Sequence, residues 1–112
     1  MTDKIIVVST CETEDEARKV ARHLVEQRLA ACVNILPGAR SIYRWQQKVE
    51  ETGEIMLVIK SSRELFPTLR EELARLHSYQ VPEVVALSII DGSSSYLDWM
   101  DRELGLRKPM NS

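Results

Sequence analysis

The sequence contains few of the residues that build metal clusters or nucleophilic active sites. Its 112 residues include only two cysteines, Cys11 and Cys32, and two histidines, His23 and His77. The cysteines lack zinc-finger spacing, and they are too sparse for a disulfide framework. A glycine-rich phosphate loop, a His-x-x-x-His pair and a Ser/His/Asp order are all absent. We therefore expect a protein that is not an enzyme.

Neither charge nor hydropathy indicates a nucleic-acid or membrane partner. The net charge is −2 and the pI is about 5.7, so there is no basic excess to attract a polyanion. No apolar run approaches the ~20 residues of a membrane helix. The start of the chain, Met1 to Lys4, lacks the order of a signal peptide. We expect one domain covering residues 1–112, located in the cytoplasm.

Residues 31–60 contain two long, apolar-rich strands joined by a tight turn at Gln46 and Gln47. A strand over 31–45 spans about 45–50 Å, whereas a helix over Glu14–Leu29 covers only about 24 Å. The far half of this β-ribbon should therefore project by about 20 Å. It carries side chains that favour burial, namely Ile42, Tyr43, Trp45 and Val49.

Two interpretations of this ribbon are open. Pro37-Gly38 could fold the first strand back onto its own domain. Alternatively, a partner subunit covers the ribbon, because an exposed ribbon of this length is an aggregation hazard. We favour the partner subunit.

Hydrophobic periodicity predicts the other elements. A β-branched run at Ile5–Val8 predicts a buried strand, and a capping box at Thr13 and Glu16 begins a helix that ends near Leu29. A leucine-striped helix over 65–76, a strand over 84–90 and a last helix stopped by Gly105 follow. Residues 106–112 should form a flexible tail. The order predicts an α+β fold: a ferredoxin-like split βαβ sandwich with a long β-hairpin and a short C-terminal helix.

The handedness of the two crossovers brings four features to one end of this fold. They are Cys11 after the first strand, the hairpin with Trp45, the end of the second helix at His77, and the start of the last strand at Glu83. This convergence predicts the location of a functional site.

Cys11 and His77 are the candidate metal ligands. Cys11 precedes a helix N-terminus, where the helix dipole favours the thiolate. A thiolate and an imidazole suit copper or zinc, but water, a third residue or another subunit would have to complete the site. Structural roles are also open: Cys11 could fill a turn, and His77 could serve as a cation at a helix C-terminus.

A second candidate site is a cleft. Pro82 fixes an extended entry into the last strand, which directs Tyr79 and Glu83 toward the shared end beside Trp45. Lys60 closes the third strand at the opposite end. It could meet such a cleft only across a subunit interface, and it could equally be an ordinary surface lysine.

Four segments together resemble one known family: LAACVNILPG (29–38), RSIYRWQQKVEE (40–51), HSYQVPEVVAL (77–87) and SYLDWM (95–100). From about Ile5 to Leu104, the chain resembles the CutA family of divalent-cation tolerance proteins. The resemblance implies a ferredoxin-like subunit in a tight homotrimer, similar in architecture to PII-type signalling proteins. It also implies a link to copper and heavy-metal tolerance.

The copper ligands proposed in this family are a cysteine that ends the first strand and two adjacent histidines that end the second helix. Cys11 matches the cysteine and His77 the second histidine, while Leu76 occupies the first histidine position. Two further departures are Ser78 in place of the usual proline and Gln47 in place of a common glycine. The implied metal site is incomplete in this sequence.

Three functions follow from these observations. The first is metal tolerance through binding of copper or another divalent cation at Cys11 and His77, with no obligatory cofactor. The second is a PII-like regulator that binds a small ligand in intersubunit clefts lined by Trp45, Tyr79 and Glu83, with Lys60 from a neighbour. The third is a trimeric scaffold that docks a protein partner.

Overall fold

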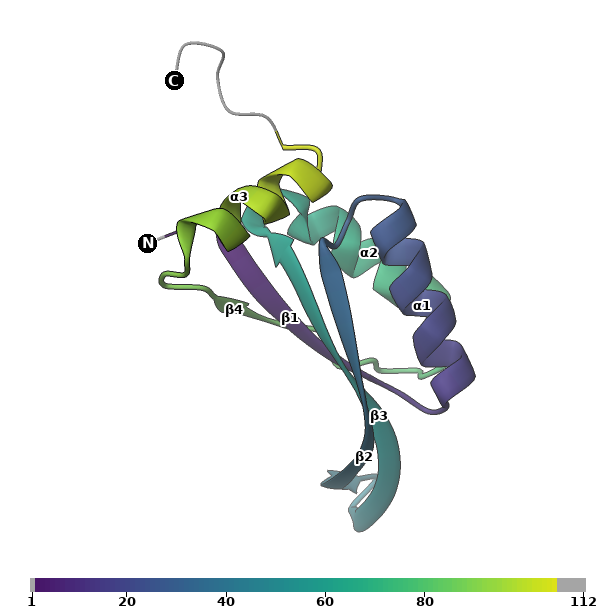
Figure 1. Cartoon of the computed structure of the whole chain (residues 1–112). Helices are drawn as coiled ribbons and strands as arrows, with labels where there is room; N and C mark the ends of the chain where they lie inside the picture. The colour runs from purple at the N-terminus through teal and green to yellow at the C-terminus, as the bar shows by residue number, and fades with distance from the viewer. Residues whose placement is uncertain (1, 107–112) are drawn as a thin grey trace.

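The computed structural model describes residues 2–106 (Figure 1). The elements in chain order are β1 (Lys4–Cys11), α1 (Glu14–Glu26), β2 (Cys32–Trp45), β3 (Lys48–Ser62), the 3₁₀ turn η1 (Arg63–Leu65), α2 (Phe66–Leu76), β4 (Val85–Ser88) and α3 (Ser94–Glu103). The strands form one antiparallel sheet in the order β2-β3-β1-β4. This topology confirms the predicted ferredoxin-like α+β fold.

The two faces of the sheet have different environments, because successive side chains of a strand point to opposite sides. One face packs against α1 and α2 and forms the core, in which Leu57 and Ile59 have no accessible surface. The other face meets α3 at its Lys4 and Lys60 end and is otherwise open. It carries Leu36, Val85 and Leu87 with exposed fractions of 44%, 49% and 54%. The fold therefore buries one side of the sheet and leaves an apolar surface on the other.

The β2–β3 ribbon projects well beyond the rest of the domain (Figure 1). β1 pairs with β3 only over Ile55–Ser62, so Lys48–Glu54 pairs with β2 alone among the described strands. At 3.3 Å per residue this segment extends about 23 Å, which confirms the predicted overhang. The interpretation that Pro37-Gly38 folds the strand back is wrong. Gly38, with φ of 88°, forms a β-bulge within a continuous strand.

Several boundaries differ from the sequence predictions, most clearly at the end of α1 and at both ends of β4. Helix α1 ends at Glu26 instead of Leu29, because Arg28 takes a left-handed φ of 58° and the N–H groups of Leu29 and Ala30 turn back to one carbonyl in α1. Strand β4 covers only Val85–Ser88 within the predicted 84–90. It lies at the sheet edge and pairs with β1 only over those four residues.

The predicted capping box is present in altered form. The Thr13 hydroxyl accepts a hydrogen bond from the Glu16 N–H at 3.1 Å. The Glu16 carboxylate reaches past Thr13 to the N–H of Glu12, also at 3.1 Å. The side chain at the third helical position therefore fixes the chain as it leaves β1.

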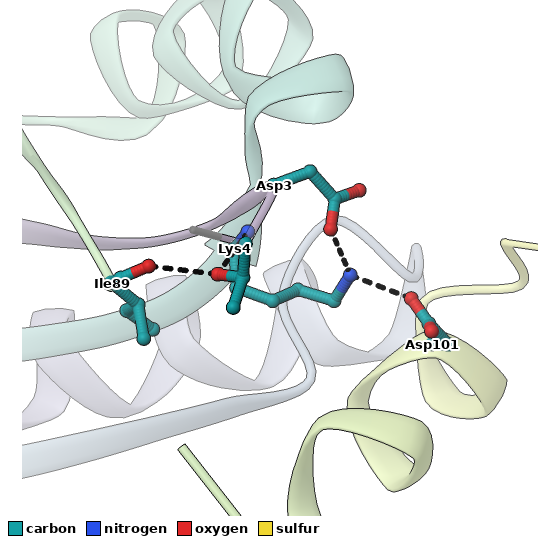
Figure 2. Close-up of polar contacts among 5 residues, drawn as sticks. Asp3, Lys4, Ile89 and Asp101 are labelled. Carbon is teal, nitrogen blue, oxygen red and sulfur yellow. Dashed lines mark hydrogen bonds and ion pairs between the residues drawn. The ribbon is translucent and has the colours of Figure 1, made fainter. Parts of the chain in front are cut away.

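Helix α3 is tied to the sheet through a buried lysine. Lys4 is 3% exposed, and its Nζ lies 2.6 Å from carboxylate oxygens of both Asp3 and Asp101 (Figure 2). Burial disfavours the charged amine, but the hydrogen bonds and charges of both aspartates outweigh it and raise the pKa of Lys4. The lysine thus joins β1 to α3 as a charged link.

Leu106 is held in place, since its N–H donates to the Asp101 carbonyl at 2.9 Å. The rest of the predicted tail, residues 107–112, lies outside the described residues. No helix within residues 2–106 has the length and apolar character needed to span a bilayer.

Candidate functional site

A cleft of about 760 Å³ opens between the ribbon and the segment that follows α2. Side chains from three strands, from Glu12 just after β1 and from residues 79–83 line it, among them Thr10, Glu12, Tyr43, Trp45, Glu54, Tyr79 and Glu83. The structure thus brings together Trp45, Tyr79 and Glu83, as the sequence predicts. Tyr43, Glu12 and Glu54 are additional members that sequence reasoning missed.

The alternation of β1 explains why Thr10 lines this cleft and Cys11 does not. Thr10 pairs with Met56, and Cys11 pairs with Ile55 on the opposite face. The Cys11 side chain therefore belongs to the core beneath α1 and α2. The cleft is a continuation of the open face of the sheet along the ribbon.

Glu54 is a half-buried carboxylate in the lining of the cleft. Burial opposes its ionisation, but hydrogen bonds from Ser41, Tyr79 and Thr10 outweigh that cost and lower the pKa of Glu54. Burial, together with the hydrogen bond and charge of Glu54, raises the pKa of the Tyr79 hydroxyl well above its usual range. The cleft therefore contains an ionised carboxylate beside a protonated phenol.

The segment carrying Tyr79 is attached to the end of β1 by two contacts. The Glu16 carboxylate accepts the Ser78 N–H at 2.8 Å. His77 Nε2 donates to the Thr10 carbonyl, while His77 Nδ1 accepts the Tyr79 N–H at 3.1 Å. An imidazole that accepts at Nδ1 and donates at Nε2 is neutral, and neither nitrogen is left for a ligand.

The Cys11 thiol is not the thiolate that the sequence predicts. It is fully buried, and desolvation, followed by the charges of Glu16 and Glu54, raises the pKa of its thiol to about 12. The expectation that the helix dipole favours a thiolate is therefore wrong. Burial among apolar and acidic neighbours outweighs the dipole.

These contacts do not fit the metal site implied by the sequence. The Cys11 thiol is protonated and inaccessible, both nitrogens of His77 are engaged, and Leu76 offers no ligand atom. Within residues 2–106, no group of three or more His, Cys, Asp or Glu residues is arranged to hold a metal ion. Metal binding at His77 would require the ring to give up at least one of these hydrogen bonds.

Lys60 lies away from the cleft, as expected. It pairs with Cys32 on β2 and Ile6 on β1, near the α3 end of the sheet. Its Nζ lies 5.7 Å from the ring centroid of Tyr96. Within one subunit it therefore contacts α3 instead of Tyr79 or Glu83.

The family model described as "CutA1 divalent ion tolerance protein" matches residues 5–103. The chain is 50% identical over 100 residues to the divalent-cation tolerance protein CutA of Thermus thermophilus, covering 89% of this chain and 97% of that relative. It is 44% identical to the human protein CutA over 81% of this chain, but it spans only 51% of the human protein's length.

Solved structures agree with these matches. The crystal structure of CutA from Xylella fastidiosa superposes with a TM-score of 0.90 at 42% identity, covering 92% of this chain and 99% of that one. The Thermus thermophilus divalent cation tolerance protein superposes with a TM-score of 0.84 at 51% identity, covering 86% and 93%. Sequence and fold agree that this chain belongs to the CutA1 divalent ion tolerance protein family.

Proposed function

We propose that this chain confers tolerance to divalent cations as a homotrimer in which each ribbon packs on a neighbouring subunit. The observation that carries this proposal is the ribbon's own apolar surface. Ile42 and Val49 are 68% and 65% exposed on a segment that extends past β1. A lone subunit with such a ribbon would be prone to aggregation through it.

The open face of the sheet supplies a complementary surface. Leu36, Val85 and Leu87 lie on it and are about half exposed. Packing a neighbour's ribbon over this face would cover both apolar surfaces at once, and a closed ring of three subunits would leave neither one free. Obligate interfaces are apolar in this way.

The same packing would place the cleft at a subunit boundary, because the cleft continues the open face along the ribbon. We propose that the trimer is a binding protein of the PII-like kind, which takes up a small ligand between Trp45, Tyr79 and Glu83. Lys60 of a neighbouring subunit is the residue we expect to reach this boundary. A cytoplasmic location also stays a prediction.

Direct binding of copper by Cys11 and His77 is the alternative. It predicts that Cu(I) or Cu(II) binds more tightly than Zn(II), following ligand softness and the usual affinity order. The buried thiol and the engaged imidazole favour the opposite result, in which a Cys11→Ala, His77→Ala double variant binds copper as the parent does. Calorimetric titration of both proteins with copper and zinc distinguishes the two outcomes.

Light scattering coupled to gel filtration tests the assembly. At micromolar protein the mass should be three times the 12.8 kDa of the subunit. A monomer at that concentration would contradict the trimer, whatever the ligand.

A further inference from the structure

One side of the cleft is formed by a segment without regular secondary structure. Helix α2 ends at Leu76 and β4 begins at Val85, and the chain between them runs as a coil (Figure 1). Residues 78–83 of this coil are the cleft wall, and four of them, 79–81 and 83, line the cleft. Within the described part of the chain, residues 80–83 make no backbone hydrogen bond. The position of the cleft wall therefore depends on contacts made at its start.

Glu16 ties the cleft wall to the end of β1 through both of its carboxylate oxygens. Oε1 accepts the N–H of Glu12 at 3.1 Å, and Oε2 accepts the N–H of Ser78 at 2.8 Å. Glu12 lines the cleft, whereas Glu16 is not among the lining residues. Burial opposes ionisation of Glu16, but its hydrogen bonds to Ser78 and Glu12 outweigh that cost and lower the pKa of Glu16. One half-buried carboxylate therefore joins two backbone segments that border the cleft.

His77 secures the next peptide unit of the cleft wall. Its Nδ1 accepts the N–H of Tyr79 at 3.1 Å, and its Nε2 donates to the Thr10 carbonyl. The rings of His77 and Tyr79 lie 4.8 Å apart, centroid to centroid. Two successive N–H groups, those of Ser78 and Tyr79, are thus held by different side chains, one from α1 and one from the end of α2.

We propose that Glu16 is a positioning residue for the cleft: it holds the cleft wall closed, and its release opens the wall as a unit. The proposal rests on the use of the cleft as a ligand site, because a wall that moves changes the shape of that site. Glu16 is a stronger anchor than His77, because hydrogen bonds to an ionised acceptor are roughly twice as strong as neutral ones. Since the two contacts hold adjacent peptide units, loss of one should displace both.

Amide hydrogen exchange, followed by NMR on the full-length protein, tests this proposal. Glu16→Ala removes the acceptor of the Ser78 N–H and should speed exchange at that amide by about tenfold or more. The decisive amide is that of Tyr79, which Glu16 does not accept. If the cleft wall opens as a unit, exchange at Tyr79 should accelerate by a comparable factor. Amides that pair β1 with β3 should be unchanged.

Thr13→Ala is the matched control. The Thr13 hydroxyl caps the same turn of α1 by accepting the Glu16 N–H at 3.1 Å, so its removal weakens the start of α1 but leaves the Glu16 carboxylate in place. This variant should speed exchange at the Glu16 amide and leave Ser78 and Tyr79 protected. Glu16→Gln keeps only one accepting oxygen and should speed exchange at Ser78 less than Glu16→Ala does.

His77→Ala gives the reciprocal measurement. It removes the acceptor of the Tyr79 N–H, and it should also speed exchange at Ser78, although Glu16 is unchanged. Circular dichroism checks the fold of each variant. Because Glu16→Ala and His77→Ala remove different contacts, failure of one variant to fold leaves the other test intact.

Faster exchange at Ser78 alone in Glu16→Ala would overturn the proposal, because it would show a lost hydrogen bond without movement of the cleft wall. Equal acceleration of Ser78 and Tyr79 in Thr13→Ala, or amides that are already unprotected in the parent, would also overturn it. Light scattering on the same samples separates these outcomes from the assembly. A trimer of Glu16→Ala in which Tyr79 stays protected refutes the positioning role alone. A monomeric parent whose Glu16→Ala variant opens both amides refutes the trimer alone.

Discussion

The two halves of β3 belong to one continuous strand but have opposite environments. In Ile55–Ser62 the strand pairs on both sides, and its core-facing residues Leu57 and Ile59 have no accessible surface. In Lys48–Glu54 it pairs on one side among the described strands, and Val49 is 65% exposed. The same backbone conformation is therefore stabilised within the subunit in one half and depends on a neighbour in the other.

This contrast divides the molecule by the source of its stability. The body of the domain carries its own core, formed by β1, β3, α1 and α2. The ribbon carries apolar side chains without a matching layer. Substitutions in the body should change folding, and substitutions in the ribbon should change assembly.

The largest expected effect is in the body. Leu57→Ala removes a fully buried side chain and should lower the free energy of unfolding by about 3 kcal/mol. Chemical denaturation at fixed protein concentration measures this loss, since the apparent stability of an oligomer depends on concentration. Val49→Ala, in the ribbon half of the same strand, should cost far less in a subunit that is kept monomeric. An equal loss of unfolding free energy in Leu57→Ala and Val49→Ala would contradict the difference between the two halves of β3.

The next effect is in the ribbon. A combined Ile42→Asp, Val49→Asp variant places two charges where we expect an apolar interface, so the trimer should dissociate while the subunit stays folded. Light scattering should then give a mass of 12.8 kDa, with an unchanged helical circular dichroism signal. Val25→Asp is the matched control, because Val25 is 42% exposed on α1 and lies outside the ribbon. Retention of the trimer by the double variant would contradict the proposed assembly.

The extended parts of the fold could be predicted from sequence because their signals are local. Alternation and length alone gave the ribbon and its overhang, and the topology followed from element order and crossover handedness. The ends of elements were less predictable. Nothing in the sequence around Leu29 marks Arg28 as the left-handed residue that ends α1, since arginine rarely takes this conformation.

The position of the candidate site could be predicted from the sequence, but the chemistry of its side chains could not. Element order placed Trp45, Tyr79 and Glu83 at one end, yet the chemistry of Cys11 depended on which face of β1 it occupies. Strict alternation from Val7, a core residue, places Cys11 on the core face, and this signal would have corrected the thiolate prediction. Glu54 required tertiary information, because its partners come from three separate segments.

A smaller effect should come from the link between the body and α3. Lys4→Met removes the amine that lies 2.6 Å from both Asp3 and Asp101. Asp101 is 22% exposed, so water compensates part of the loss, and we expect a cost of about 1–2 kcal/mol. Hydrogen exchange should show the increase in amide exchange concentrated in α3. An increase confined to the ribbon would contradict this assignment.

The double variant Lys4→Met, Asp101→Leu is the companion measurement. It replaces the Lys4–Asp101 pair with apolar groups and should recover part of the stability that Lys4→Met loses, because the partly buried Asp101 carboxylate is then no longer left unpaired. Asp3, the other partner of Lys4, is 60% exposed and can be solvated by water. A double variant no more stable than Lys4→Met would show that packing, and not the unpaired charge, accounts for the cost.

The smallest expected effect is at the outer edge of the helical layer, far from the ribbon. Glu72 accepts hydrogen bonds from Arg75 at 2.9 Å and lies 2.7 Å from His23 Nε2, which joins α2 to α1. These two partners, Arg75 first, lower the pKa of Glu72 to about 2. A carboxyl with a lowered pKa in the folded state stabilises the protein above its unfolded pKa of about 4.3. That contribution is lost as the pH falls through about 2.

Glu72→Gln should therefore lower the unfolding midpoint slightly at pH 7, and the midpoints of variant and parent should converge in strong acid. The shift should be small because solvent screens exposed ion pairs. Thermal unfolding at several pH values, with Glu71→Gln as the exposed control on the same helix, measures it. A constant difference between variant and parent down to strong acid would contradict an electrostatic origin.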